Sequence, residues 1–390
     1  MDEMLEATDL PLKSGATDAM DELNPKTNSD PLEEESAMPE SVSAREGSQQ
    51  DSVGQIRNAL QEKPGHTQRS EPEETRTRSR RNKSRTEILL GPGDTIGEGD
   101  SRILYDLDLP SDAFWKIQRE VDWQTMYHLS GQVPRLVAVQ GLSNADNSVP
   151  IYRHPADEAP PLRPFTPSVD RTRILVEGIL GHPLNHALIQ LYRNGEDRIT
   201  EHSDKTLDIL RGSFICNVSL GAQRTMVLRS KASAGDKSTG EERLNPGRHT
   251  QRVPLPDKSL FVLGEKTNMR WLHGIRPDRR PSLDKSVEER AYGGVRISLT
   301  FRHIGTFTDP VAGTIWGQGA CSKSREKAGN VIHGNVRQTS WLVRAFGEEN
   351  HATDLDWDAV YGEGFDVVNF VTASTAKLAR VEPYEHVQRM

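Results

Sequence analysis

Two histidines and one aspartate give this sequence its clearest potential for chemistry. In an extended strand, side chains two residues apart point to the same face, so His202 and Asp204 can bind one metal ion from the same side. His273, with apolar neighbours, is the candidate for the third ligand. Two histidines and a carboxylate form the facial triad of non-haem Fe(II) oxygenases, which leaves coordination positions open. A His-x-Asp triplet is common by chance, and a single histidine among apolar residues is more often part of a core, so the interpretation needs further support.

A polar strand face supplies that support, because the segment Arg296–Arg302 alternates strictly. Its apolar positions are Ile297, Leu299 and Phe301, and its polar positions are Arg296, Ser298, Thr300 and Arg302. The two sets must lie on opposite faces of a strand. A buried arginine is costly unless it is paired, and guanidinium binds carboxylate bidentately. The natural counter-charge is a dicarboxylate cosubstrate, and the alternative for either arginine is an internal Asp or Glu.

Short strands separated by Gly and Pro are predicted to position these residues. Strands are expected at 135–140, 187–192, 214–218, 226–229, 260–263, 296–303 and 340–346. Helices are expected at 114–126, from the stripe Phe114, Ile117, Val121 and Met126, and at 170–179. Residues 231–257 have few apolar positions and are interpreted as a long insertion loop. Many short strands favour a closed or double-sheet antiparallel architecture.

The composition divides the chain before Tyr105, the first aromatic residue. Residues 1–90 are rich in Glu, Ser, Asp, Thr, Arg and Pro, which predicts a disordered tail with acidic and basic parts. Residues 1–50 hold thirteen acidic and three basic residues, so they carry −10 of the chain's net −8 and leave +2 for the rest. The basic run 76–85 fits nuclear import or phosphate contact, and equally a solvated linker. The net acidity therefore does not exclude a nucleic-acid partner.

Membrane and secretory classes are not favoured. The sequence has no run of eighteen apolar residues and no leader-like start at Met1, so we expect neither a membrane span nor a secretory signal. Two cysteines, Cys216 and Cys321, are too few for a disulfide framework or a four-thiolate zinc site, and they suit a reducing compartment. We expect a monomer in the nucleus, with the cytoplasm as the alternative.

Taken together, the motifs resemble the AlkB-type Fe(II)- and 2-oxoglutarate-dependent dioxygenases, especially the branch that repairs alkylated nucleic acid. The likeness rests on His202-x-Asp204, the remote His273 and the Arg-x-x-x-Thr-x-Arg strand, and it covers about residues 108–346. Supporting segments are 133–135 and 219–224. The resemblance implies a mainly β fold with flanking helices around a double-stranded β-helix, or jelly-roll, core. It places the dioxygenase domain at 91–346, with 347–390 as a C-terminal extension packed on it.

The resemblance also implies the cofactors and their ligands. His202, Asp204 and His273 would hold Fe(II), and O2 and 2-oxoglutarate would be the cosubstrates. Arg296 would bind the distal carboxylate of 2-oxoglutarate. The other implied contacts are Tyr192, Gln190, Ser298, Thr300 and Arg302, with Arg302 either near the metal-side carboxylate or paired with Asp204. Gln190 and Ser298 both stand where the family commonly has Asn.

The substrate assignment depends on fewer residues. Lys205 follows Asp204 where relatives that act on nucleobases have an acidic residue, and Asp208 is a possible substitute for that acid. Tyr152 is a candidate to stack on a flipped base, or else an anchor for its loop. Arg224, with Arg229 and the arginines at 276, 279 and 280, is a candidate to steer phosphates, or else part of a solvated face.

The predicted function is oxidative demethylation of N-alkylated nucleobases in DNA or RNA, which releases formaldehyde, succinate and CO2. One alternative is a dioxygenase of the same fold that acts on a protein side chain, a lipid or a small metabolite. Lys205 and the modest charge favour that alternative slightly. A binding module that has lost its iron fits poorly, because all three ligands and Arg296 are present.

Overall fold

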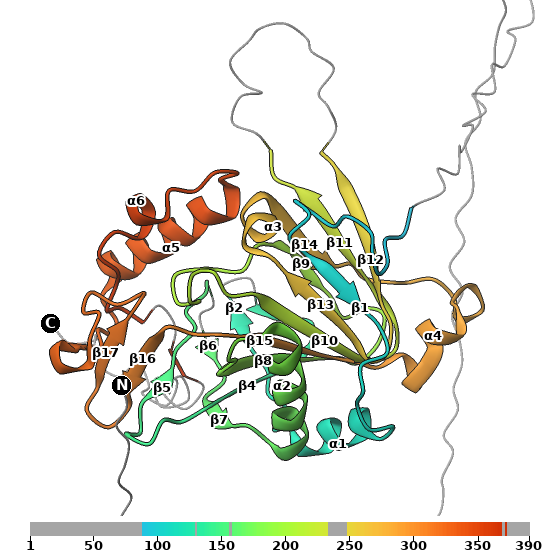
Figure 1. Cartoon of the computed structure of the whole chain (residues 1–390), viewed down its shortest axis with the longest axis horizontal. Coiled ribbons are helices and arrows are strands. Elements are labelled where there is room, and N and C mark those ends of the chain that lie inside the picture. Colours follow the sequence, from blue (N-terminus) through green and yellow to red (C-terminus); the bar gives the residue numbers. More distant parts are fainter. Residues whose placement is uncertain (1–87, 129–130, 156–157, 233–247, 369–370, 373–390) are drawn as a thin grey trace, which may run out of the picture. The chain divides into compact units, whose positions relative to one another are not determined.

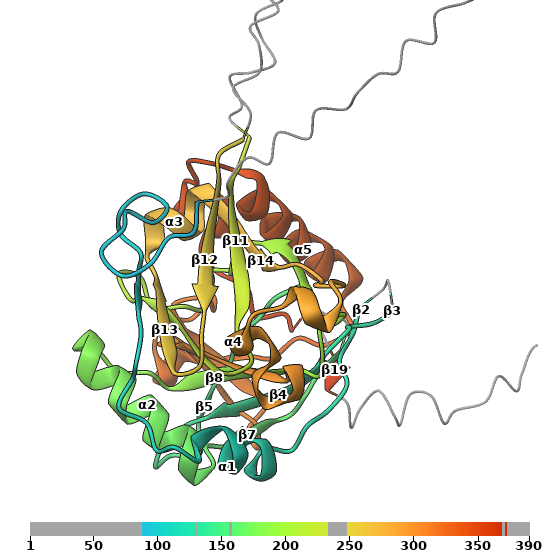
Figure 2. The same ribbon diagram turned by 90° about the vertical axis from the view of Figure 1, so that its right-hand side faces the viewer.

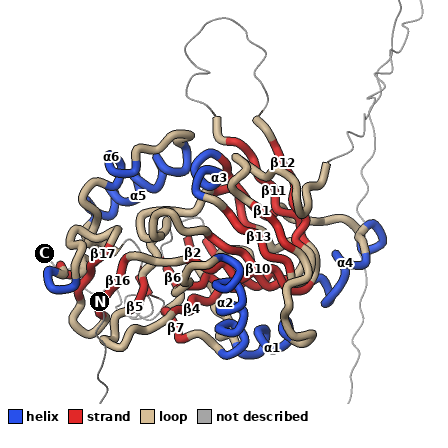
Figure 3. Tube along the Cα trace, in the orientation of Figure 1, coloured by secondary structure: helices blue, strands red, loops and turns tan. Residues whose placement is uncertain are grey.

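The computed structural model describes residues 88–128, 131–155, 158–232, 248–368 and 371–372 (Figure 1). Every described residue belongs to one compact unit, which lies within Arg81–Met390. The predicted tail of residues 1–90 lies outside the described residues except for 88–90. Strands dominate this unit, as Figure 3 shows.

A large sheet of seven strands forms the main layer. In spatial order its strands are β1 (Arg102–Leu104), β13 (Ser259–Leu263), β10 (Ile215–Gly221), β15 (Arg296–Arg302), β8 (His186–Tyr192), β4 (Leu136–Gly141) and β7 (Leu162–Pro164). All neighbouring pairs are antiparallel except β4 and β7. Five of these strands were predicted as short strand-like stretches of the sequence, and the structure confirms them with ends shifted by up to three residues.

A second sheet of four antiparallel strands faces the first. Its order is β12 (Thr250–Leu255), β11 (Arg224–Ser230), β14 (Trp271–Ile275) and β9 (Ile199–His202), and Figure 2 shows β12, β11 and β14 side by side. Apolar side chains of both sheets share one core, which joins Met226 and Val253 to Ile215 and Phe261. The chain therefore has the jelly-roll core that the resemblance implied.

Helices cover the outer face of the large sheet. α1 (Ala113–Glu120) and α2 (Pro167–Leu180) pack Phe114, Ile117 and Val176 against a core that includes Ile297 and Leu299 of β15. The apolar half of the β15 alternation is thus directed to the helices. The polar half must point into the space between the two sheets. α1 ends at Glu120, before the Met126 with which the predicted stripe ended.

The remaining elements are short or lie beyond the two main sheets. They include α3 (Glu265–Arg270), α4 (Val287–Arg290), α5 (Val336–His351), α6 (Trp357–Tyr361) and 3-10 turns at Ser282–Asp284, Ala291–Gly294 and Arg325–Lys327. A third sheet has the order β18 (Gly329–Asn330), β17 (Thr314–Gly317), β16 (Thr306–Asp309) and β5 (Val149–Pro150). A fourth has the order β19 (Val371–Thr372), β6 (Glu158–Ala159), β2 (Tyr127–His128) and β3 (Gly131–Gln132). No described helix has the length and apolar character needed to cross a membrane.

Two sequence-based predictions about secondary structure were wrong. The segment 231–257, interpreted as a loop, contains strand β12, because Val253 and Leu255 are buried against β11 despite the polar residues around them. The strand predicted at 340–346 is part of helix α5. Its buried residues Leu342, Ala345 and Phe346 recur at helical spacing, and the side chain of Asn335 caps the first turn.

The domain boundary predicted after residue 346 falls inside α5, so the dioxygenase domain and the C-terminal extension share this helix. A separate apolar cluster joins Phe346 of α5 and Tyr361 of α6 to Leu207, which follows β9 in the chain. The residues after 346 that the structure describes are thereby packed against the segment that follows Asp204. Residues 369–370 and 373–390 lie outside the described residues.

Candidate metal centre and cosubstrate pocket

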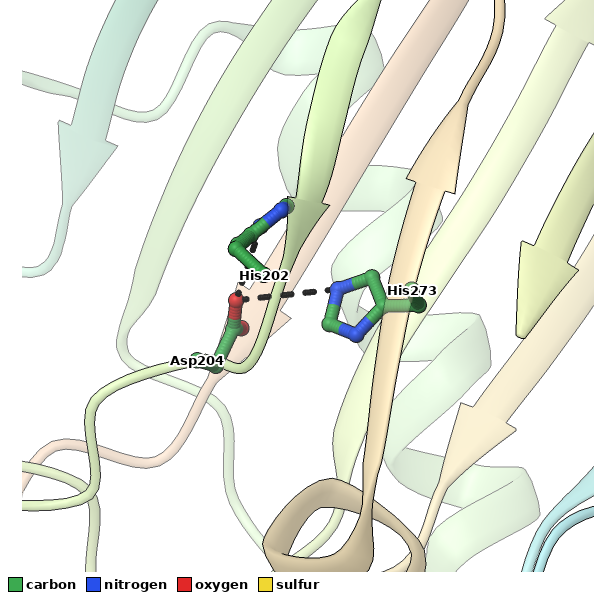
Figure 4. Close-up of side chains that lie close together, drawn as sticks. All are labelled: His202, Asp204 and His273. Carbon is green, nitrogen blue, oxygen red and sulfur yellow. Dashed lines mark ion pairs between the residues drawn. The ribbon is translucent and has the colours of Figure 1, made fainter. Parts of the chain in front are cut away.

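The three predicted metal ligands lie together between the two sheets. His202 ends β9, His273 lies in β14, and Asp204 is in the loop that follows β9 (Figure 4). Their possible ligand atoms lie within 4.8 Å of one another. Asp204 Oδ1 is 3.6 Å from His202 Nε2 and 3.8 Å from His273 Nε2. Among the described residues this is the only such cluster of three or more His, Cys, Asp or Glu side chains.

Strand pairing explains why residues about seventy positions apart meet. His273 stands directly opposite His202 in the β14–β9 ladder, where the register shifts before Ile275. Gly274 lies at this irregularity, and a Cβ on it would come within 2.9 Å of the Ile199 carbonyl oxygen. Only glycine lets β14 approach β9 this closely without displacing its backbone.

Hydrogen bonds orient two of the ligands, His202 and Asp204, toward the same point. His202 Nδ1 lies 2.8 Å from the Thr200 carbonyl oxygen, which leaves Nε2 as the free ligand atom. Asp204 Oδ2 accepts from Arg302 Nη2 at 2.6 Å and from Nε at 3.2 Å, so Oδ1 is the oxygen left for a metal. Of the two roles open to Arg302 in the sequence, the structure shows the pairing with Asp204.

The protonation states suit metal binding. Burial alone would raise the pKa of Asp204, but the charge of Arg302 holds it well below its ordinary value. Burial, with a smaller contribution from His202, lowers the pKa of His273 to about 3. The carboxylate is therefore ionised and His273 neutral at neutral pH, as ligand atoms must be.

Arg296 lies on the inward face of β15 without a carboxylate partner among the described residues. Its Nη2 donates to Ser219 Oγ at 2.7 Å and to Asn217 Oδ1 at 3.2 Å, while Nε and Nη1 are buried with no hydrogen-bond partner in the described part of the chain. Burial lowers the pKa of this guanidinium to about 10. Two unsatisfied donors on one buried cation are the arrangement that a carboxylate completes bidentately.

The other predicted cosubstrate contacts surround Arg296. In the β8–β15 ladder Tyr192 stands opposite Arg296, and Gln190 stands opposite Ser298. The Arg296 guanidinium lies 5.1 Å from the centre of the Tyr192 ring. The Tyr192 hydroxyl donates to Gln190 Oε1 at 2.8 Å. Asn217 Nδ2 donates to Ser298 Oγ at 2.6 Å and to Thr300 Oγ1 at 3.0 Å. The polar face of β15 is thus already cross-linked by side chains of β10.

One cavity of about 770 Å³ contains both the ligand cluster and Arg296. This volume lies within the range of small-molecule sites. Its lining comes from both main sheets and from α5, and it includes Tyr192, Asn217, Ser298 and Arg302. A metal at the triad and a keto-diacid held by Arg296 would therefore share one cavity.

Tyr152 and Lys205 line this cavity but do not have the free side chains that the substrate predictions assumed. The Tyr152 ring is 8% exposed and is covered by the Arg302 guanidinium at 4.1 Å, and its hydroxyl accepts from the Lys205 backbone N–H at 3.2 Å. Lys205 Nζ donates to Asn350 Oδ1 at 3.2 Å, and burial lowers its pKa. The anchoring role left open for Tyr152 is therefore the one that its contacts favour.

The arginines predicted to steer phosphates are already paired. Arg224 is 7% exposed and donates to the backbone carbonyl oxygens of Asn194, Asp197 and Arg276. The ion pairs of the others are Arg229 with Glu201, Arg276 with Glu201, Arg279 with Glu196, and Arg280 with Asp278 and Glu289. The prediction for Arg224 was wrong, because its guanidinium fixes the loop between β8 and β9 instead of facing solvent.

Asp208 is not in the cavity either. It forms a fully buried ion pair with Arg153, whose Nη2 lies 2.6 Å from Oδ1 and whose Nε lies 3.1 Å from Oδ2. Arg153 also donates to the carbonyl oxygens of Gly319 and Phe365. The sequence could not show this, because Arg153 is 55 positions away. Asp208 as a substitute for a substrate-binding acid was therefore wrong.

We expect Asp208→Ala to lower the free energy of unfolding by about 3–5 kcal/mol, because it leaves Arg153 buried without its counter-charge. Denaturant unfolding measures this loss. The exposed pair Arg211–Asp358 is the control, and Asp358→Ala should cost less than about 1 kcal/mol. An Asp208→Ala protein of unchanged stability that has lost only substrate affinity would restore the substrate role.

Sequence reasoning missed the β10 side chains Asn217 and Ser219, which bind Arg296 and its neighbours. Both lie on the polar positions of the otherwise apolar strand Ile215–Gly221, the same alternation that identified β15. That pattern could have found them. No comparable sequence pattern marked Asn268 of α3 or Asn350 of α5, whose side chains bind the loop that contains Asp204.

Comparisons with known proteins agree with this geometry. Residues 109–302 match the family model described as 2OG-Fe(II) oxygenase superfamily. Human DNA oxidative demethylase ALKBH2 is 35% identical over 144 residues, which is 36% of this chain and 48% of that protein. The bovine alpha-ketoglutarate-dependent dioxygenase alkB homolog 3 is 28% identical over 211 residues, 53% of this chain and 64% of that protein. The chain thus spans about half to two thirds of the length of these relatives.

Among solved structures, "The structure of OsALKBH1" matches 52% of this chain and 96% of that chain, at 14% identity and a TM-score of 0.35. A structural similarity this low supports no conclusion about the fold or function of this chain.

The jelly-roll core, the His-Asp-His cluster and the unpaired Arg296 define a 2OG-Fe(II) oxygenase. Within that superfamily, the chain belongs to the AlkB-type dioxygenases. Its cofactor is Fe(II) and its cosubstrates are 2-oxoglutarate and O2. The residues fit them: two imidazole nitrogens and one carboxylate oxygen form the donor set for the metal, and the two free donors of Arg296 suit a carboxylate.

Proposed function

We propose that this protein oxidatively demethylates N-alkylated nucleobases in DNA or RNA, with release of formaldehyde, succinate and CO2. The observation that carries the proposal is that one cavity holds the metal ligands and Arg296. The bound iron would supply the oxidation with O2 and 2-oxoglutarate. The nucleobase assignment rests on the relatives, since human ALKBH2 is called a DNA oxidative demethylase.

The protein's own residues supply placement. His202, Asp204 and His273 hold the metal at one point of the cavity. Arg296 fixes the distal carboxylate of 2-oxoglutarate, and Asn217 and Ser219 in turn hold the guanidinium. Arg302 binds the non-ligating oxygen of Asp204, so this carboxylate presents a single oxygen to the metal. Because a base cannot be reached inside a duplex, the substrate base must be flipped out or single-stranded.

A specific observation also favours the second candidate, a dioxygenase of the same fold that acts on a protein side chain, a lipid or a small metabolite. The arginines that were the best candidates for phosphate contacts donate to backbone carbonyl oxygens or to neighbouring carboxylates. The described surface around β14 therefore offers less free positive charge than the sequence suggested. The nuclear location and monomeric state remain part of the proposal, with the cytoplasm as the alternative location.

The test is formaldehyde release from N-methylated single- and double-stranded oligonucleotides, beside methylated peptides of matched concentration. We expect formaldehyde from at least one methylated oligonucleotide, in equal amount to the succinate formed, and none from the unmethylated strands. His202→Ala is the control for iron-dependent turnover. Formaldehyde from the peptides alone would replace the nucleobase proposal by the second candidate.

A further inference from the structure

Helix α5 lies outside the family match, which ends at residue 302, yet it forms part of the cavity wall. The lining residues on this helix are Val343, Phe346, Gly347, Asn350 and His351. They recur at intervals of three and four positions, so one face of the helix is directed toward the site. Figure 1 shows α5 as a separate element beyond the two main sheets.

The side chain of Asn350 binds both sides of the metal ligand Asp204. Its Oδ1 accepts from the Ser203 backbone N–H at 3.1 Å and from Lys205 Nζ at 3.2 Å. These two donors belong to the residues directly before and after Asp204. One amide oxygen of α5 thus fixes the backbone on one side of the ligand and the side chain on the other.

Glu349, the neighbour of Asn350 on α5, binds the next residue of the same loop, Thr206. Its side chain is almost fully buried, and Oε1 accepts from the Thr206 backbone N–H at 2.9 Å and from the Thr206 hydroxyl. Its other oxygen accepts from the Tyr361 hydroxyl of α6, and its backbone carbonyl oxygen accepts from Lys231 Nζ at 2.7 Å. The buried carboxylate is therefore held by Thr206 and Tyr361, and Lys231 fixes the backbone of the same residue.

The loop 203–206 needs such support because it belongs to no strand or helix. On its other side, Asn268 of α3 exchanges two hydrogen bonds of 2.9 Å with the Asp204 backbone. α3 lies within the family match and α5 does not. Without α5 the loop would lose every contact of Glu349 and Asn350 and keep those to Asn268, Tyr152 and Arg302. Ordering this less supported loop on metal binding would cost conformational entropy.

We propose that α5 is a component of the metal centre, in which Glu349 and Asn350 are positioning residues that hold the Asp204 loop in its ligating conformation. The inference rests on the metal site and not on the identity of the substrate. It also accounts for Lys205, whose ammonium group is directed to α5 as part of this attachment.

The test is the dissociation constant of Co(II), a spectroscopic stand-in for Fe(II), measured on the full chain by its visible absorption. We expect Asn350→Ala to weaken Co(II) binding by about 10- to 100-fold, the usual effect of removing a partner of a metal ligand. Asn350→Asp keeps the acceptor oxygen and should retain more of the affinity. Glu348→Ala is the matched control, because Glu348 is the exposed neighbour on the same helix turn.

Denaturant unfolding without metal is measured beside each titration, so that a loss of folded protein is separated from a loss of affinity. Should Asn350→Ala be poorly folded, Asn350→Ser replaces it, since its shorter hydroxyl does not reach the Ser203 N–H. A Co(II) affinity within twofold of the unaltered protein in a folded Asn350 variant would overturn the proposal. A loss of Co(II) affinity in Glu348→Ala as large as that in Asn350→Ala would overturn it as well. Loss of oligonucleotide demethylation with Co(II) affinity intact would count against the positioning role and leave the proposed function standing.

Discussion

His202→Ala is expected to reduce 2-oxoglutarate turnover to background and to weaken metal binding by more than about 100-fold, since losing a residue that merely hydrogen-bonds a metal ligand already costs about 10- to 100-fold in affinity. The fold should survive. The His202 side chain is 31% exposed, and its ring is hydrogen-bonded to the neighbouring Thr200 carbonyl oxygen, so we expect a stability loss below about 1 kcal/mol. Succinate formation, metal titration and denaturant unfolding measure the three quantities.

Asp204→Ala provides the contrast, because this ligand is also the counter-charge of a buried arginine. Its removal should abolish turnover as well, but it leaves Arg302 buried and uncompensated, at a cost of about 3–5 kcal/mol in stability. The two ligand variants should thus match in activity and differ in unfolding midpoint. Substantial succinate formation by a folded His202→Ala protein would remove this histidine from the metal centre.

Arg296→Met is expected to weaken 2-oxoglutarate binding by about 2–5 kcal/mol, roughly 30- to 5000-fold, because it deletes one partner of a buried charge pair. Metal binding should persist, since Arg296 is not among the ligands. In the absence of 2-oxoglutarate the variant should be as stable as the unaltered protein or more stable. Burial of a cation with two unsatisfied donors opposes folding, and burial of a methionine does not.

Calorimetric titration of 2-oxoglutarate into Mn(II)-loaded protein measures the affinity, and denaturant unfolding of the metal-free protein measures the stability. Arg296→Lys is the matched control, because it keeps the positive charge but not the planar guanidinium. Its 2-oxoglutarate affinity should lie between that of the unaltered protein and that of Arg296→Met. Unchanged 2-oxoglutarate affinity in Arg296→Met would contradict the assignment. A stability loss above about 3 kcal/mol would show that Arg296 is a structural cation.

A substitution that weakens ligand binding while keeping or raising stability indicates that the replaced side chain is buried for function. The same reasoning separates Arg296 from Arg302 and Arg153, which look alike in the sequence. Arg302 and Arg153 have carboxylate partners within the protein, so their loss should destabilise it. Among the residues that the structure describes, Arg296 has only neutral oxygens as partners, from Asn217 and the serines Ser219 and Ser298.

Much of the fold was predictable from local pattern. Short strand-like stretches separated by Gly and Pro predicted β4, β8, β10, β13 and β15. Within β15, strict alternation assigned Arg296 and Arg302 to the inward face. The pattern failed at 340–346, where a short apolar run is compatible with either a strand or a buried helix face. It failed at β12 because polar residues surround the two buried ones.

The sequence by itself determined the metal-ligand types, the inward placement of Arg296 and the mainly β class, because each depends on residue identity or on a two-residue period. Tertiary structure alone decided which charges meet. Arg302 with Asp204, Arg153 with Asp208 and Asn350 with the Asp204 loop are contacts across 98, 55 and roughly 147 positions. A local period reports which way a side chain points, whereas its partner is set by how distant elements pack, and that information is absent from any short window of sequence.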